Sequence, residues 1–189
     1  MPVRIAALLD LATVTGLLRE LTPFTVMLDE DADKRDRWMR VEPPESVELV
    51  AGLGLRIRTS AALQWTVAGV KIPVTIRTAA ISLGLELTDT KEGIRLVALP
   101  KIDEADLKNV PEMLDDKLVD VVNARLAAKA GEIGWTFGET LALKLKLPEA
   151  LAPVEAFQMD VSNASLEVTA DAVRLDAQLP MHFSRAPGA

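Results

Sequence analysis

The segment Ile72–Leu87 constrains the fold most, because it reads as one long strand whose apolar alternation changes phase halfway. Even positions carry the apolar residues up to Ile76, and odd positions carry them from Ile81 onward. Side chains alternate between the two faces of a strand, so one face stays apolar only if an extra residue is inserted between them. Strands usually have about 5–6 residues. The pattern therefore predicts a long strand, bent by a β-bulge within Arg77–Ile81, in a curved sheet.

The rest of the chain predicts further strands and two helices. Alternating apolar residues predict strands at Val47–Arg58, Leu63–Val67, Ile94–Leu99 and Leu141–Leu147, followed by a meander of Phe157–Val161, Leu166–Ala170 and Val173–Leu179. Helical spacing of apolar residues predicts a helix over residues 1–20 and a longer one over Pro111–Ala130. In the longer helix the apolar stripe comprises Leu114, Leu118, Val121, Val122 and Leu126. The expected fold class is α+β, with a long, curved antiparallel sheet wrapped around the long helix and an additional N-terminal helix.

Length and composition limit the classes of protein that the chain can belong to. With 189 residues, it is expected to form a single domain over 1–189, with a frayed tail at 186–189. Hydrophobic residues make up 49% and aromatic residues 4%, so the core is aliphatic. The net charge of −7 argues against nucleic acid as a partner, because such a surface needs a basic face. The absence of cysteine excludes disulfides and thiolate metal sites.

The N-terminal segment does not read as an uncleaved secretory signal. Asp10 interrupts its apolar run, and Arg19 and Glu20 follow without a small-residue cleavage site. We therefore expect a cytoplasmic protein if the chain is complete, and a periplasmic one if an export signal has been removed.

Side chains in catalytic or metal-binding patterns are not found. His182 is the single histidine, and no serine lies in a nucleophile-elbow sequence. The acidic run that begins at Asp29 lacks the glycine and the closing glutamate of a calcium loop. Asp116 and Asp120 share a helix face, with Lys117 and Arg125 nearby, which is typical of a solvated surface. The sequence predicts a protein that is not an enzyme and has no catalytic residue, metal or cofactor.

The order of elements resembles that of the tubular lipid-binding superfamily, which includes bactericidal/permeability-increasing-like proteins and synaptotagmin-like mitochondrial lipid-binding domains. The similarity lies in a helix, long antiparallel strands, the helix Pro111–Ala130 and a C-terminal meander. The stretch Leu118–Leu126, together with the following strand that ends at Pro148, is the part most similar to such domains. The resemblance contains no diagnostic motif. It implies a curved sheet with a lipid-sized groove and no catalytic residues.

The sequence and the resemblance together favour binding or transport of a long-chain lipid or fatty acid. The expected site is a hydrophobic groove between the long helix and the sheet, because long amphipathic strands and few aromatic residues leave room for an acyl chain. The predicted wall residues are Trp65, Leu83, Leu85, Leu118, Val122, Leu143 and Leu145. One alternative is a non-catalytic structural or protein-interaction domain with a filled core, and another is an enzyme built from scattered carboxylates. Transient membrane contact and a homodimer also stay open.

Overall fold

The computed structural model describes residues 2–29, 36–67, 70–91, 93–108, 112–130, 134–137, 141, 143–148, 150 and 154–185. The secondary structure of these residues is mostly β. The helices are α1 (Leu11–Leu21) and α2 (Glu112–Lys129). The strands are β1 (Pro2–Asp10), β2 (Phe24–Met27), β3 (Trp38–Val41), β4 (Ser46–Val50), β5 (Gly54–Val67), β6 (Val70–Thr90), β7 (Gly93–Leu107), β8 (Gly134–Thr136), β9 (Leu143–Lys146), β10 (Val154–Met159), β11 (Asn163–Val168) and β12 (Ala172–Arg185).

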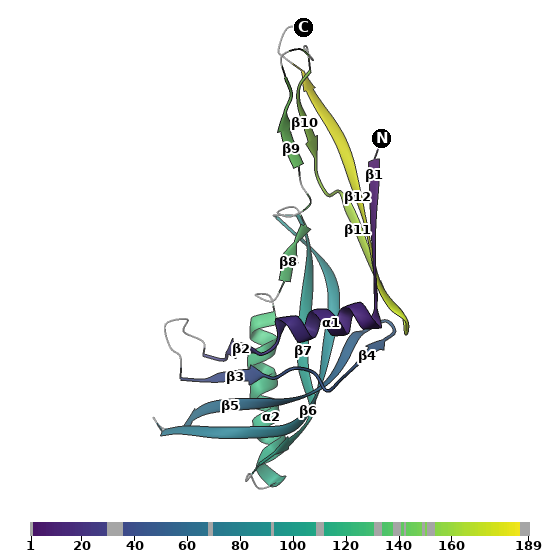
Figure 1. Ribbon diagram of the computed structural model, residues 1–189. Coiled ribbons are helices and arrows are strands. Elements are labelled where there is room, and N and C mark those ends of the chain that lie inside the picture. The colour runs from purple at the N-terminus through teal and green to yellow at the C-terminus, as the bar shows by residue number, and fades with distance from the viewer. Residues whose placement is uncertain are drawn as a thin grey trace.

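In the described part of the chain, these strands form two antiparallel sheets that lie end to end in an elongated molecule (Figure 1). The seven-stranded sheet has the order β2-β3-β5-β6-β7-β8, with β4 also paired to β5. The five-stranded sheet has the order β1-β12-β10-β9, with β11 also paired to β12. Helix α1 connects the two sheets, because it follows β1 of one sheet and precedes β2 of the other.

The predicted bulge in the long strand is confirmed. Strand β6 places Ile76 opposite Ala61 and Ala79 opposite Thr59, so Arg77 and Thr78 together face the single residue Ser60 of β5. Val74 and Ile76 are buried before the bulge, and Ala79 and Ile81 are buried on the same face after it, although the small side chain of Ala80 on the other face is buried too. One apolar face is thereby maintained along a strand of 21 residues.

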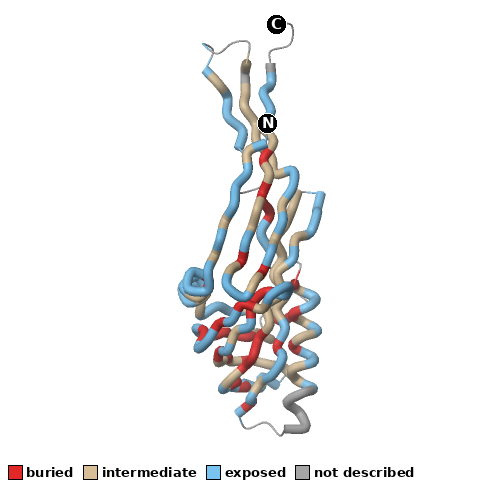
Figure 2. The backbone as a smooth tube through the Cα atoms, turned by 90° about the vertical axis from the view of Figure 1, so that its right-hand side faces the viewer, coloured by how far each residue is buried: buried red, intermediate tan, exposed pale blue. Residues whose placement is uncertain are grey.

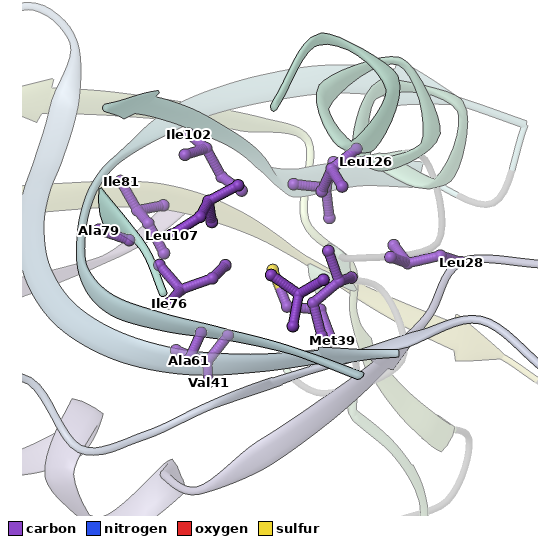
Figure 3. Close-up of a cluster of buried hydrophobic side chains, with 13 residues drawn as sticks. Leu28, Met39, Val41, Ala61, Ile76, Ala79, Ile81, Ile102, Leu107 and Leu126 are labelled. Carbon is purple, nitrogen blue, oxygen red and sulfur yellow. The ribbon is translucent and has the colours of Figure 1, made fainter. Parts of the chain in front are cut away.

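Two clusters of buried side chains form the core. The first core cluster lies between the seven-stranded sheet and α2 and includes Met39, Leu63, Ile81 and Leu126 (Figure 3 shows this cluster). The second core cluster joins the two sheets and α1, and its buried members are Val14, Val47, Leu49, Leu55, Val168 and Val173. Figure 2 shows the buried segments mainly in the lower half of the molecule, whereas the end with the C-terminal strands is exposed or of intermediate burial.

The expectation of an α+β fold with a sheet wrapped around a long helix is wrong. The chain is mostly β, the two sheets curl, and α2 lies beside the strands instead of being enclosed by them (Figure 1). The side-chain amide of Asn123 in α2 bonds both the backbone N–H and the C=O of Ile102 in β7, at 2.8 Å each. Helix α2 therefore satisfies backbone groups of β7 that β6 leaves free, which is one way in which proteins protect a sheet edge.

The predicted apolar stripe of α2 is correspondingly too wide. Val122 and Leu126 are buried and Leu118 is partly buried, but Val121 is 43% exposed. The side chain of Leu114 lies outside the described residues. The helix packs through one narrow face, as expected for a helix that contacts a sheet from one side only.

The prediction of a helix over residues 1–20 is wrong in its first half. Residues Pro2–Asp10 form β1, which pairs antiparallel with β12 from Ala172 to Pro180. The segment fits a strand because Val3, Ile5, Ala7 and Leu9 also alternate. A helical spacing and a strand spacing thus coexist in this segment, and pairing with the distant C-terminal strand selects the strand.

Two other strand expectations also change. The expected strand Val47–Arg58 is a hairpin, in which β4 and β5 are joined by a turn at Ala51–Leu53 with Gly52 at a φ of 73°. The expected one-face burial of Leu141–Leu147 does not occur in the part that forms β9, where Leu143 to Lys146 are all exposed. The expected tail at 186–189 lies outside the described residues.

Candidate apolar ligand site

An apolar cavity of about 230 Å³ lies at the seam between the two core clusters. Side chains of the second cluster, Leu18, Ile57 and Leu83, form part of its wall. Side chains of the first cluster complete it, namely Val26, Met39, Val41, Ile81 and Leu126. The cavity therefore lies between α1 and the seven-stranded sheet, and Leu126 is the one described side chain of α2 that lines it.

The position of α1 is fixed at its N-terminus by a cap. The carboxylate of Asp10 accepts a hydrogen bond of 2.8 Å from the backbone N–H of Thr13, as in a standard helix N-cap. This bond holds the pKa of Asp10 below its usual value of 3.8. Val14 is buried in the second core cluster and Leu18 packs against it, four residues further along the same helix face. The last turn, with Leu21, therefore lies beside the cavity.

The sheet wall of the cavity depends on the bulge in β6. Ile57 of β5 pairs with Ile81 of β6, and Leu55 pairs with Leu83. Cross-strand partners lie on the same face of a sheet, so Ile57, Ile81 and Leu83 present a continuous aliphatic surface. Without the extra residue at Arg77–Thr78, Ile81 and Leu83 would point away from the face that carries Val74 and Ile76.

The cavity is open where α1 meets β2. Leu21 and Phe24 line it, yet their exposed fractions are 69% and 43%. Large apolar side chains that are this exposed beside a cavity mark its mouth, because they contact both the interior and the solvent. A ligand could enter here without the sheet opening.

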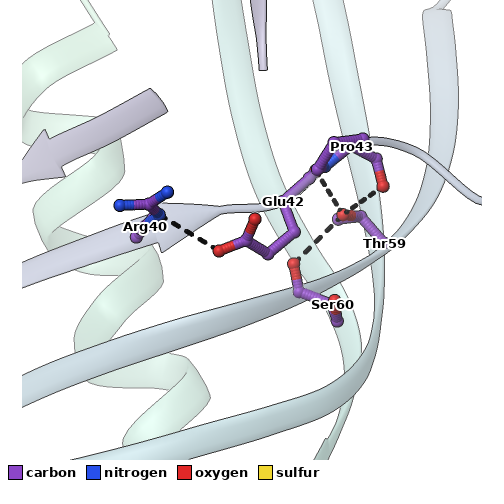
Figure 4. A network of polar contacts seen from close by, with 5 residues as sticks. All are labelled: Arg40, Glu42, Pro43, Thr59 and Ser60. Carbon is purple, nitrogen blue, oxygen red and sulfur yellow. Dashed lines mark hydrogen bonds and ion pairs between the residues drawn. The ribbon is translucent and has the colours of Figure 1, made fainter. Parts of the chain in front are cut away.

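Glu42 is the charged residue among those that line the cavity, and its carboxylate is already engaged. It pairs with the guanidinium of Arg40 at 3.1 Å (Figure 4). The hydroxyl of Thr59, a fully buried residue, donates a hydrogen bond of 2.7 Å to the backbone C=O of Glu42. This network holds the rim of the cavity and leaves the interior to hydrocarbon groups.

The structure separates the seven residues that the sequence predicts as lipid-binding. Leu83 lines the cavity, and Leu85 packs against the second core cluster. Val122 is buried in the first core cluster, and Trp65 and Leu118 pack against it. Leu143 and Leu145 lie on β9 in the other sheet, with exposed fractions of 38% and 47%. Their assignment to a lipid site stays a prediction.

Sequence reasoning missed the wall that α1, β2 and β3 provide. A signal was present, since Leu18 and Leu21 are three residues apart on one helix face and Phe24 follows in an alternating segment. That signal shows an amphipathic helix next to a strand. It does not show which sheet the helix covers.

Comparisons with known proteins give little beyond this geometry. No protein-family model matches the chain, and no curated protein matches it. Among solved structures, the chain is similar to a lipopolysaccharide binding protein, with a TM-score of 0.40 and 16% sequence identity. The alignment covers 99% of this chain and 52% of that one, so the chain spans about half the length of this protein.

In the part of the chain that the structure describes, no group of three or more histidine, cysteine, aspartate or glutamate side chains could hold a metal ion. Neither α1 nor the described part of α2 is long and apolar enough to cross a membrane.

Proposed function

We propose that this protein binds the acyl chain of a lipid or fatty acid in the cavity between α1 and the seven-stranded sheet. The observation that carries the proposal is the cavity itself. It is walled by aliphatic side chains from both core clusters, and its mouth is formed by exposed Leu21 and Phe24. A packed domain leaves few voids larger than a water molecule. A void of about 230 Å³ with an apolar lining therefore favours an apolar occupant.

The size of the cavity limits how much of a ligand it can hold. A volume of 230 Å³ lies below the range of about 300–1,000 Å³ for drug-sized pockets. A methylene group is similar in size to a water molecule, whose share of liquid volume is about 30 Å³. The cavity then accepts roughly eight methylene groups. The remainder of a longer chain, and its headgroup, would lie outside the mouth.

The energetics suit a carrier that must also release its ligand. Burial of a methylene group is worth about 0.8 kcal/mol, so eight groups supply roughly 6 kcal/mol before the cost of association. Selectivity in such a site comes from chain length and shape, because the polar side chains that line the cavity, Thr22 and Glu42, already have partners within the protein. We extend the proposal to the whole of 1–189 as one non-catalytic lipid-binding unit of tubular lipid-binding type. Membrane contact and a homodimer remain predictions.

A non-catalytic protein-interaction domain is the second candidate, and one surface favours it. At the far end of the five-stranded sheet, apolar side chains from three neighbouring strands share one face. They are Leu143, Leu145, Phe157, Met159, Met181 and Phe183. Phe183 is 61% exposed although its ring lies 5.3 Å from that of Phe157. An exposed apolar face of this kind is typical of a contact surface.

Filling the cavity tests the acyl-binding proposal. Ala98 of β7 lines the cavity, and Ala98→Phe should occupy the space that the acyl chain needs. We expect binding of cis-parinaric acid, a linear fluorescent fatty acid, to weaken at least about tenfold, which corresponds to loss of about 1.4 kcal/mol. The thermal midpoint should change little, because the new ring enters an existing void instead of a packed region.

The matched control is Ala6→Phe, which places the same ring on an exposed position of β1. This variant should bind the fatty acid like the unchanged protein. Equal binding by the unchanged protein and the Ala98→Phe variant would contradict the proposal, and so would a complete lack of binding by the unchanged protein.

A further inference from the structure

A second hollow lies on the outer face of β5, β6 and β7, behind the strands that form the wall of the apolar cavity. Its volume is about 420 Å³. Arg56 and Arg58 of β5 form one side, and Lys101, Asp103 and Glu104 of β7 form the other. We call this hollow the outer trough. Since side chains alternate along a strand, Ile57 faces the apolar cavity while its two neighbours face the trough.

The floor of the outer trough is low because β6 carries small residues there. Arg56 pairs with Ser82, and Ser82 pairs with Lys101, so these three side chains form one row across the sheet. Arg58, Ala80 and Glu104 form the next row. Three neighbouring strands thus place cations on one side, small side chains in the middle, and a mixed pair of charges on the other side (Figure 1 shows the three strands).

Some charged side chains of the trough have partners within the protein, and others do not. The carboxylate of Asp103 accepts a hydrogen bond from the hydroxyl of Ser82 and pairs with Lys101 at 3.5 Å. Within the described residues, the side chains of Arg56, Arg58 and Glu104 form no hydrogen bond or ion pair. Glu48 of β4 lies opposite Arg56 in the register without pairing with it. Two guanidinium groups two residues apart on one strand face repel each other unless an anion lies between them.

We propose that the outer trough binds a small zwitterion that carries a phosphate group and an ammonium group. The phosphate lies against Arg56 and Arg58, whose planar guanidinium groups match phosphate oxygens in a bidentate way. The ammonium lies against the carboxylate of Glu104. Strands β5 and β7 are next-nearest neighbours and so lie about 10 Å apart. That spacing suits the short bridge between the two charges of a phosphoethanolamine group.

A dipolar ligand fits the trough better than a simple anion. The trough holds three cationic side chains and two carboxylates, so a free phosphate gains from one side and is repelled by the other. A zwitterion uses both sides. This use of both charges distinguishes the trough from the apolar cavity, whose polar side chains already have partners within the protein.

Calorimetric titration of the full chain with O-phosphoethanolamine tests the proposal. We expect saturable binding of one equivalent, and a loss of about tenfold or more in Arg56→Gln and in Arg58→Gln. Lys144→Gln, which removes the same charge from exposed β9, should have no effect. Ala98→Phe should also leave this binding unchanged, so failure of the acyl-binding proposal and failure of this one are distinguishable.

Glu104→Gln tests the predicted contact between the ammonium group and the carboxylate. It should weaken O-phosphoethanolamine by up to about fivefold, the range of an exposed ion pair, and leave inorganic phosphate bound at least as well as before. Equal affinity for the two ligands with no response to Glu104→Gln would overturn the proposal. Absence of saturable binding up to about 1 mM would also overturn it.

Vesicles distinguish the two sources of the group. If the protein co-sediments with vesicles that contain phosphatidylethanolamine, and soluble O-phosphoethanolamine releases it, the trough recognises a lipid headgroup. If only the soluble compound binds, its occupant is a free metabolite. Sedimentation that persists in the Arg56→Gln variant and is not reversed by the soluble compound would count against the site.

Discussion

Replacing Leu126 with alanine is expected to lower the free energy of unfolding by about 2–3 kcal/mol, measured by urea denaturation. Leu126 is 1% exposed and belongs to the first core cluster, where α2 meets the sheet. The value lies at the low end of the range for buried leucine because one side of the side chain faces the apolar cavity. Contacts on that side are already missing, so fewer are lost.

Val121→Ala is the matched control on the same helix. Val121 is 43% exposed, and alanine is the better helix former, so the free energy of unfolding should change by less than about 0.5 kcal/mol. Equal effects of the two substitutions would contradict the arrangement in which α2 contacts the sheet through one narrow face.

Gly54→Ala is expected to destabilise the protein by about 3 kcal/mol in the same measurement. Gly54 has a φ of 147°, a conformation that residues with a side chain rarely adopt. A Cβ atom at this position would overlap the carbonyl oxygen of Leu83 in the neighbouring strand. The backbone would have to move where Leu83 lines the apolar cavity, so fatty-acid binding should weaken as well.

Gly52→Ala in the preceding turn separates the effect of backbone strain from the effect of steric overlap with β6. Gly52 also has a positive φ, of 73°, but apart from its two chain neighbours no described residue has an atom within 4 Å of the position of its Cβ. The substitution should cost only the strain of a left-handed residue, about 1 kcal/mol. If both glycine variants unfold at the same urea concentration, close approach of Gly54 to β6 is not what stabilises this part of the sheet.

The bulge shows how far sequence alone could go. A strand whose apolar period of two changes phase can keep one face buried only by gaining or losing a residue at that point. Strand β6 does so through its bulge. The long helix is predicted for the same reason, because it has a clear period in its own residues. The expected C-terminal meander of three strands is wrong: β10 and β11 follow one another along the same strand, β12, and so form one long hairpin with it.

Partners distant in the sequence could not be predicted in this way. Residues Pro2–Asp10 fit a helix or a strand by local pattern, and only pairing with β12, at the other end of the chain, makes them a strand. The same limit applies to α2. Its stripe predicts that it packs on something, but the bonds of Asn123 to Ile102 place it beside β7 instead of inside the sheet.

The candidate site was predicted only in part for the same reason. Leu83 was identified because it lies on the apolar face of the longest strand. Leu18, Leu21 and Phe24 were not, because their contact with that face depends on how α1 passes from one sheet to the other. Leu143 and Leu145 have a regular alternation, yet β9 is an outer strand with no described layer over it.

Competition between cis-parinaric acid and saturated fatty acids of increasing length tests the central claim most directly. The cavity should accept one chain, and the affinity should rise about fourfold per added methylene group, the equivalent of about 0.8 kcal/mol. The increase should level off once roughly eight groups fill the 230 Å³ of the cavity. No displacement at any length, or displacement that does not depend on length, would contradict the account.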